Sequence, residues 1–384
     1  MAALFALTLI GVGCASGIST GADEPTVEGD LRIVQRLAQQ GAFHLAWSPD
    51  GRLLAVDSGD GSYAVWDTTS GRKVRELRDK SWGRFGGGVS LAFSGDGKHV
   101  IVPADVVNAP RMIGGKRVEL GAWNIETGAI DAVLLGPDAP ANRIGLRDFA
   151  VAGERLAVLY QNNESATPRY LIAVYDTRTW QLIDSWPVDG SRALAFDRTG
   201  TLIAVGRSSP YGGDDVGLPH GQIRIYDAAS GRLVTMLDGV HQSIVTHLAF
   251  VGSNRIVSTA SQVDRGFNRT TLRSRQLVDG DPVRIWDLAS GNKALSFRVA
   301  VDTPYALSSG GGVVALSGTR NRPGRFWVWD TEGPREVGRL SSESTYFTAV
   351  AVNPDGRTVA IGNVRLGGEG FEVLVVAIGS TGRM

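Results

Sequence analysis

The side chains that most often perform chemistry are few in this chain and widely spaced. Its five histidines do not show the spacing of metal ligands; they are His44, His99, His220, His241 and His247. No nucleophile elbow and no His-Glu-x-x-His motif is present, and the run at 114–116 lacks the hydroxyl that a phosphate-binding loop needs. We therefore predict a protein that is not an enzyme, with no catalytic residue, no metal and no cofactor.

Arginine and aromatic side chains are instead concentrated in segments of variable length. Such side chains are the usual anchors of protein interfaces, and arginine pairs well with carboxylates. The candidates for binding a partner are Trp82, Arg84, Phe85, Arg111, Arg117, Arg265, Arg269, Arg273, Arg275, Arg320 and Arg322. The alternative is that these are solvated loop charges, because aspartates such as Asp214 and Asp264 lie in the same segments.

Short apolar strands must position these segments. The stretch 283–291, Val-Arg-Ile-Trp-Asp-Leu-Ala-Ser-Gly, begins with the period-two pattern of a β-strand. The carboxylate of Asp287 can then accept a hydrogen bond from a backbone N–H two residues on. Gly291 can take the positive φ that reverses the chain. The stretch thus predicts a strand, a tight turn and a return strand.

The same pattern recurs along the chain. Copies of the aromatic-Asp or Trp-Asn pair end strands near 66, 123, 175, 226, 286 and 329, and a degenerate copy lies at 371–377. A second signal precedes most copies, an apolar strand followed by a polar turn such as Ser-Pro-Asp-Gly at 48–51. Together they predict a repeat of four short strands every 45–60 residues or so. One four-stranded sheet cannot bury both faces alone, whereas several packed radially can.

These paired signals resemble those of the WD-repeat family of β-propellers. The resemblance covers nearly all of the chain beyond about the first thirty residues, and it implies an all-β, seven-bladed propeller of four-stranded antiparallel blades. It also implies that His241 joins Trp286 in a structural hydrogen-bond network, and that the other blades, which lack the family's Gly-His signal, close without such a network. The residues expected to have structural roles are Trp66, Asp67, Trp123, Asp176, Asp227, His241, Trp286, Asp287, Trp329 and Asp330.

The ends of the chain are expected to close the ring. The last repeat, 346–377, contains three strands, and the stretch 31–37 reads as a lone strand. Pairing these two segments completes the seventh blade and removes unpaired sheet edges. We therefore place the propeller at 31–379, after a leader at 1–17 and a flexible tether at 18–30.

The leader predicts export. Residues 2–13 form an uncharged apolar run, too short to cross a bilayer but suitable for a signal peptide. The run Ile10-Gly11-Val12-Gly13-Cys14 resembles the lipobox of bacterial lipoproteins, which implies lipid attachment at Cys14. An ordinary signal peptide cleaved near Ala15, or a disordered leader, is the alternative. The expected location is the cell envelope or periplasm, with membrane contact only through this lipid.

Composition limits the possible partners. Cys14 is the only cysteine, so the chain cannot form an internal disulfide, and the formal net charge is zero. A balanced charge gives no reason to expect nucleic-acid binding. The first hypothesis is a monomeric interaction scaffold that binds a protein or peptide through the loop face. The second is an exported propeller enzyme, or a binder of sugars or other small ligands, that uses the central funnel. A third is a fragment of a larger signalling protein.

Overall fold

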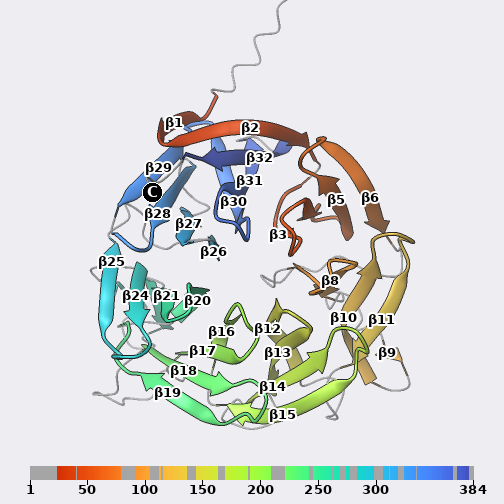
Figure 1. Ribbon diagram of the computed structural model, residues 1–384, viewed down its shortest axis with the longest axis vertical. Coiled ribbons are helices and arrows are strands. Elements are labelled where there is room, and N and C mark those ends of the chain that lie inside the picture. Colours follow the sequence, from red (N-terminus) through yellow and green to blue (C-terminus); the bar gives the residue numbers. More distant parts are fainter. Residues whose placement is uncertain are drawn as a thin grey trace, which may run out of the picture.

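The protein is a ring of antiparallel sheets. The computed structural model describes residues 24–39, 41–78, 91–103, 112–113, 116–135, 144–162, 169–188, 191–208, 221–241, 245–260, 263–267, 274–276, 283–297, 306–310, 312–318, 324–333, 335–365 and 370–379. Every helix or strand within these ranges is a β-strand. Seven sheets stand as blades around one axis, as Figure 1 shows, so the all-β, seven-bladed propeller is confirmed.

The first four blades follow one another along the chain, and their strands are given from the axis outward. Blade 1 contains β3 (Leu45–Trp47), β4 (Leu53–Asp57), β5 (Ser62–Asp67) and β6 (Arg72–Arg78). Blade 2 contains β7 (Ala92–Phe93), β8 (His99–Pro103), β10 (Lys116–Asn124) and β11 (Ile130–Leu135), and β9 (Met112–Ile113) pairs with β10. Blade 3 contains β12 (Ile144–Ala152), β13 (Arg155–Asn162), β14 (Arg169–Asp176) and β15 (Leu182–Val188). Blade 4 contains β16 (Ser191–Phe196), β17 (Leu202–Ser208), β18 (Gly221–Asp227) and β19 (Leu233–Leu237).

The remaining blades include the additions to the repeat. Blade 5 contains β20 (Val245–Val251), β21 (Arg255–Ala260), β24 (Val283–Asp287) and β25 (Lys293–Phe297), with a separate hairpin of β22 (Val263–Phe267) and β23 (Ser274–Gln276). Blade 6 contains β26 (Ala306–Gly310), β27 (Val313–Ser317), β28 (Arg325–Asp330) and β29 (Glu336–Ser341), and β1 (Thr26–Gly29) adds a fifth strand outside β29. Blade 7 contains β30 (Thr345–Val352), β31 (Thr358–Arg365), β32 (Phe371–Ile378) and β2 (Leu31–Ala38).

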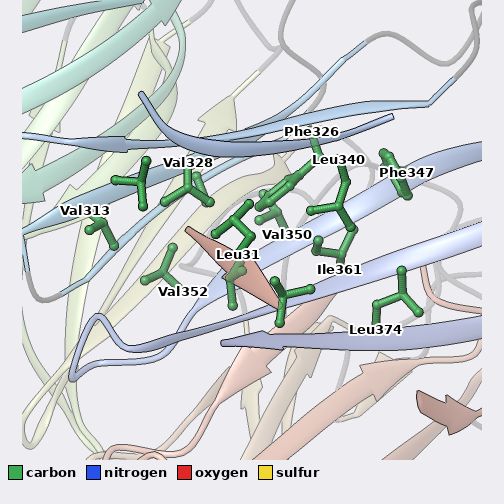
Figure 2. Packing of buried hydrophobic residues seen from close by; sticks show 14 residues of the cluster. Leu31, Val313, Phe326, Val328, Leu340, Phe347, Val350, Val352, Ile361 and Leu374 are labelled. Atoms are coloured by element: carbon green, nitrogen blue, oxygen red, sulfur yellow. The ribbon is translucent and has the colours of Figure 1, made fainter. Parts of the chain in front are cut away.

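The core is divided among the contacts between blades. Buried apolar residues form seven clusters, and each cluster joins two neighbouring blades. On β4, Leu54 and Val56 face blade 7, whereas Ala55 between them faces blade 2. Figure 2 shows the cluster between blades 6 and 7, where Phe326 lies close to Phe347. Each sheet is therefore buried on both faces by its neighbours, which explains the continuous apolar runs in second strands such as β4 and β27.

A β-bulge recurs at one position of every outer strand. It lies opposite the residue that precedes Asp in the Trp-Asp pattern. In blade 1, Val65 pairs with Arg75 and Trp66 pairs with Lys73, so Val74 is the extra, unpaired residue of the outer strand. The other outer strands show the same shift. In β6, β15, β19 and β2, the extra residue is an exposed large apolar side chain, 46–49% accessible. A bulge increases the local twist of an edge strand.

The first and last described strands meet in the last two blades. β2 pairs antiparallel with β32 from Leu31↔Ile378 to Ala38↔Glu372 and completes blade 7, as expected. Residues 26–29, which we expected to be part of a flexible tether at 18–30, form the strand β1 instead. Main-chain pairing with β29 and an ion pair between Glu28 and Arg339 hold this strand.

Candidate functional site

The connections of the ring emerge on two opposite faces. Within a blade, consecutive strands are antiparallel, so the first and third turns lie at one face. We call this the turn face. The connections between second and third strands, and those between blades, lie at the other face, which we call the insertion face. The β22–β23 hairpin belongs to a second-to-third connection and therefore to the insertion face.

Most of the predicted partner-binding residues lie outside the described part of the chain. Arg117 is in β10, Arg265 in β22 and Arg275 in β23, and the structure describes their backbone but not their side chains. The others lie outside it altogether: Trp82, Arg84, Phe85, Arg111, Arg269, Arg273, Arg320 and Arg322. Cys14 lies outside it as well. The hairpin pairs Val263 with Gln276 and Phe267 with Ser274, so Arg265 and Arg275 occupy opposite strands of one small sheet.

Aspartates of the Trp-Asp pattern cap the turns at the turn face by accepting hydrogen bonds from backbone N–H groups. Asp67 Oδ1 accepts hydrogen bonds from the backbone N–H groups of Thr69 and Ser70, at 3.1 and 2.9 Å. The N–H of Ser70 and the guanidinium of Arg52 hold the pKa of Asp67 at about 2. The same capping, from a backbone N–H two or three residues on, is made by Asp176, Asp227, Asp287 and Asp330. These carboxylates terminate strands and are occupied by their own turns.

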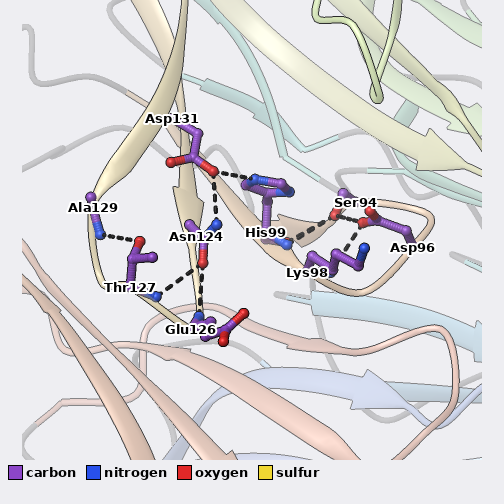
Figure 3. Close-up of polar contacts among 9 residues, drawn as sticks. All are labelled: Ser94, Asp96, Lys98, His99, Asn124, Glu126, Thr127, Ala129 and Asp131. Carbon is purple, nitrogen blue, oxygen red and sulfur yellow. Dashed lines mark hydrogen bonds and ion pairs between the residues drawn. The ribbon is translucent and has the colours of Figure 1, made fainter.

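Blade 2 achieves the same turn with asparagine, as Figure 3 shows. Asn124 Oδ1 accepts from the backbone N–H groups of Glu126 and Thr127, at 2.9 and 3.0 Å. Its amide donates to Asp131 Oδ2 at 2.8 Å, and that oxygen also contacts His99 Nε2 at 2.9 Å. Unlike an aspartate, Asn124 has an amide donor, and its bond to Asp131 connects the turn to β11 and, through His99, to β8.

Blade 3 keeps the turn although it lacks the glycine. Trp180 takes a φ of +59°, close to the +68° of Gly71 in blade 1. Its N–H bonds to the carbonyl of Asp176 at 2.7 Å, as the N–H of Gly71 does to Asp67 at 2.8 Å. The Trp180 ring lies edge-on to His99 of blade 2, with 5.3 Å between ring centroids. A left-handed tryptophan is unfavourable, and packing across the blade interface offsets that cost.

Two blades contain a buried network around a serine. In blade 5, Ser258 Oγ lies 2.8 Å from His241 Nε2 and accepts from Trp286 Nε1 at 3.1 Å. His241 and Ser258 are 1% and 0% exposed. The link between His241 and Trp286 thus passes through a hydroxyl that sequence reasoning did not single out.

Blade 1 contains a similar network in which glutamine replaces histidine. Gln39 Nε2 donates to Ser58 Oγ at 2.6 Å, and Gln39 Oε1 accepts from Trp66 Nε1 at 3.1 Å. The expectation that only blade 5 has such a network is therefore wrong. The available signal was the position of Gln39, six residues before the first strand of blade 1, much as His241 lies four residues before the first strand of blade 5. A glutamine amide can both donate and accept.

The remaining tryptophans of the structural set serve the core. Trp123 is 1% exposed in the cluster between blades 1 and 2, and Trp329 packs against the cluster between blades 5 and 6. Both belong to third strands, where they cover the neighbouring blade.

The inner strands carry mostly small and apolar residues. Some backbone N–H groups at their free edges donate hydrogen bonds to side chains of the preceding blade. Asp148 Oδ2 accepts from the N–H of Leu194 in blade 4 at 2.8 Å, and Ser308 Oγ accepts from the N–H of Val352 in blade 7 at 3.0 Å. Asp148 is the only carboxylate in the inner strands as described. Burial raises its pKa to about 7. It is committed to positioning the backbone.

A second titratable group with a shifted pKa, half-buried like Asp148, lies on the inner strand of blade 5. His247 Nδ1 is 3.0 Å from Thr259 Oγ1 and 3.2 Å from Thr246 Oγ1. Burial lowers the pKa of His247 to about 4, so its imidazole is neutral near pH 7.

A polar cavity of about 290 Å³ lies beside the Gln39 network in blade 1. Lys73, Glu76, Arg78 and Asp60 contribute both signs of charge to its lining. These groups already pair with each other, Lys73 with Glu76 at 3.3 Å and Arg78 with Asp60 at 3.6 Å. The cavity is therefore best understood as a solvated seam between β2 and blade 1.

Metal-ligand clusters and membrane-spanning helices are both absent from the described ranges. No three His, Cys, Asp or Glu side chains there are grouped as metal ligands would be. No helix in this part of the chain has the length and apolar character needed to cross a membrane.

The geometry defines a closed propeller with tight turns on one face and insertions on the other. Residues 34–67 match the family model described as "WD domain, G-beta repeat". The chain is similar in fold to a solved structure described as "Crystal Structure of Mitotic Checkpoint Complex", at 15% sequence identity and a TM-score of 0.61, with 99% of each chain covered. No curated protein sequence matches the chain. The family match covers residues 34–67, and the likeness to the solved structure shows that the chain shares its fold.

Proposed function

We propose that this protein is a WD-repeat interaction scaffold that binds a protein or peptide through its insertion face. The observation that carries the proposal is the asymmetry of the ring. The turn face is built from short capped turns, whereas the connections at the insertion face vary in length and include the β22–β23 hairpin. Variable loops on a rigid frame are the usual site of recognition. The structural neighbour belongs to a protein complex, which agrees with such a role.

A catalytic or sugar-binding role in the central funnel has less support. Such a role needs convergent polar groups near the axis. Asp148 is the carboxylate that the described inner strands supply, and two backbone N–H groups, from Leu194 and Phe149, already bond to it. The arrangement therefore favours binding of a partner over catalysis.

Site-specific photo-crosslinking in the native cell tests the binding face. A photoreactive residue at Arg265 or Arg275 reports on the insertion face, and one at Thr69 or Ser230 reports on the turn face. We expect a protein adduct of one defined mass from the first pair only. Adducts that arise equally from both faces, or from the turn face alone, would refute the assignment.

We further propose that the protein is exported and anchored by a lipid on Cys14. The support is the apolar leader and the lipobox-like run that ends at this cysteine. Labelling with a fatty acid should modify the wild-type chain but not Cys14→Ser, and fractionation should move the variant from the membrane to the soluble envelope fraction. An unlabelled wild-type chain in the cytoplasm would contradict both parts.

A further inference from the structure

The outer strands of the ring differ in how their free edges are protected. A free edge can pair with another chain unless charge, proline or a covering strand prevents it. Charged residues occur in β2, β6, β11 and β25, β15 contains Asp184 and Pro187, and β1 covers β29. β19, with the sequence Leu-Val-Thr-Met-Leu, has none of these features. Among the outer edges formed by the described residues, the edge of β19 is the one without such protection.

The side chains of β19 are also unusually exposed. Leu233, Val234 and Met236 are 44, 46 and 41% accessible. Leu237, at the end of the strand, is buried in the cluster between blades 4 and 5. The strand is therefore held firmly by its own blade while it presents an apolar edge to solvent.

The molecule itself shows that an outer edge of this kind accepts another strand. β1 pairs antiparallel with residues 338–341 of β29, and the N–H of Asp30 bonds to the carbonyl of Val337 at 2.9 Å. Val337 is the bulge residue of β29, so the bulge does not prevent pairing. Opposite Arg339 of β29 stands the complementary charge of Glu28. Met236 is the residue of β19 that corresponds in its blade to Arg339 of β29. A strand that pairs with β19 therefore needs no charged residue opposite this position.

The two ends of β19 indicate which strand matches it. Arg232 precedes the strand, Asp238 follows it, and both are exposed. If two copies pair antiparallel about a two-fold axis at Thr235, Arg232 of each copy stands opposite Asp238 of the other. The apolar residues then face each other between these ionic pairs. Gln222 Nε2 donates to Asp238 Oδ1, which fixes this carboxylate at the strand end. β19 is thus complementary to a second copy of itself.

We propose that two copies of this chain associate through antiparallel pairing of their β19 strands. Blade 4 of each copy then continues into blade 4 of the other as one eight-stranded sheet. Both insertion faces remain free, so the contact is independent of the proposed partner site. The proposal replaces the monomer expected from the sequence.

Sedimentation velocity on the full chain, over a range of concentrations, tests the proposal. We expect a concentration-dependent dimer that weakens as salt is added. Met236→Lys should abolish the dimer, whereas Val74→Lys, at an equally exposed apolar position on β6, should leave it intact. A monomer at every concentration, or a dimer that Met236→Lys does not weaken, would overturn the proposal.

A charge exchange tests the register and guards against misfolding. Arg232→Glu and Asp238→Lys should each weaken dimerisation by roughly tenfold, because each places like charges opposite one another twice in the symmetric contact. The double variant restores both ionic pairs and should recover the wild-type affinity. Failure of this rescue, with unfolding curves like those of the wild type, would rule out the two-fold register.

Discussion

Two half-buried titratable side chains, Asp148 and His247, give the stability of this ring opposing dependences on pH. The native pKa of Asp148 is about 7, whereas an unfolded aspartate titrates near 3.9. Between these values the native state holds a proton that the unfolded state has lost, so stability falls as pH rises. The native pKa of His247 is about 4, against about 6.5 when unfolded, so here the unfolded state holds the extra proton and stability rises with pH. The two slopes largely cancel between about pH 4 and 6.5.

Replacing either residue should reveal the slope of the other. Asp148→Asn keeps an acceptor for the N–H of Leu194 but does not titrate, so stability should rise more steeply from pH 4 to 6.5 than in the wild type. His247→Asn keeps an acceptor near Thr259 Oγ1, and stability should then fall over the same interval. Each slope is at most about 1.4 kcal/mol per pH unit. Urea unfolding at several pH values measures both, and parallel profiles for all three proteins would contradict the assignment.

The serine in the blade 5 network should matter more than its size suggests. Ser258→Ala leaves His241 Nε2 and Trp286 Nε1 without this buried partner, at a cost of about 1–3 kcal/mol. Trp286→Phe removes one of the two groups that bond to this hydroxyl, so the double variant should lose less stability than the sum of the single losses. Denaturant unfolding of the three variants completes the cycle. Strict additivity would show that the hydroxyl does not couple to the indole.

At the scale of elements, the turns between third and fourth strands in blades 1, 2, 4 and 5 lie against the outer strand of the preceding blade. A Cβ atom at Gly231 in blade 4 would lie 2.6 Å from the ring of Trp186 in blade 3, whereas one at Gly291 in blade 5 would meet Leu237 of blade 4 at 3.8 Å. Both glycines have positive φ, +64° and +68°. The two sites thus share a backbone conformation but differ in the space around it.

Alanine at these two glycines separates backbone strain from steric overlap. Gly291→Ala should cost about 1 kcal/mol, the price of a left-handed residue. Gly231→Ala should cost a further 1–3 kcal/mol or so, because the buried Trp186 must move. Thermal unfolding compares the pair directly. Equal losses would mean that the turn of blade 4 yields without disturbing blade 3.

The repeated strands and the ring closure could be predicted from sequence because alternation and turn residues are local signals. The turn at Trp180 could not, since its left-handed tryptophan depends on packing against His99 in another blade. Gln39 was missed for a similar reason, because its role depends on Ser58 and Trp66 in a sheet to which it does not belong. β1 was missed because an exposed four-residue strand has no burial pattern of its own. The insertion face was predicted by the length of its connections, which specifies the face but not its side chains.

At the scale of the whole molecule, β2 is the element on which closure depends. Leu31 at its start belongs to the cluster between blades 6 and 7, and Leu37 near its end to the cluster between blades 7 and 1. The strand also covers the edge of β32, whose Val373, Leu374 and Val376 are fully buried. Without β2, two of the seven interfaces lose apolar contacts and an apolar strand edge becomes exposed.

Deletion of residues 24–38 should therefore destabilise every blade and not only the seventh. Because each sheet is buried by its neighbours, opening the ring at one place should lower the unfolding temperature of the whole molecule and cause aggregation through β32. Deletion of 24–29 alone is the matched control, because it removes the exposed β1 but leaves β2 in place; we expect only a small decrease. Leu37→Ala gives an intermediate variant that should lose about 2–5 kcal/mol. Calorimetry with light scattering measures all three, and an unchanged unfolding temperature in the longer deletion would show that the ring is stable without its terminal strand.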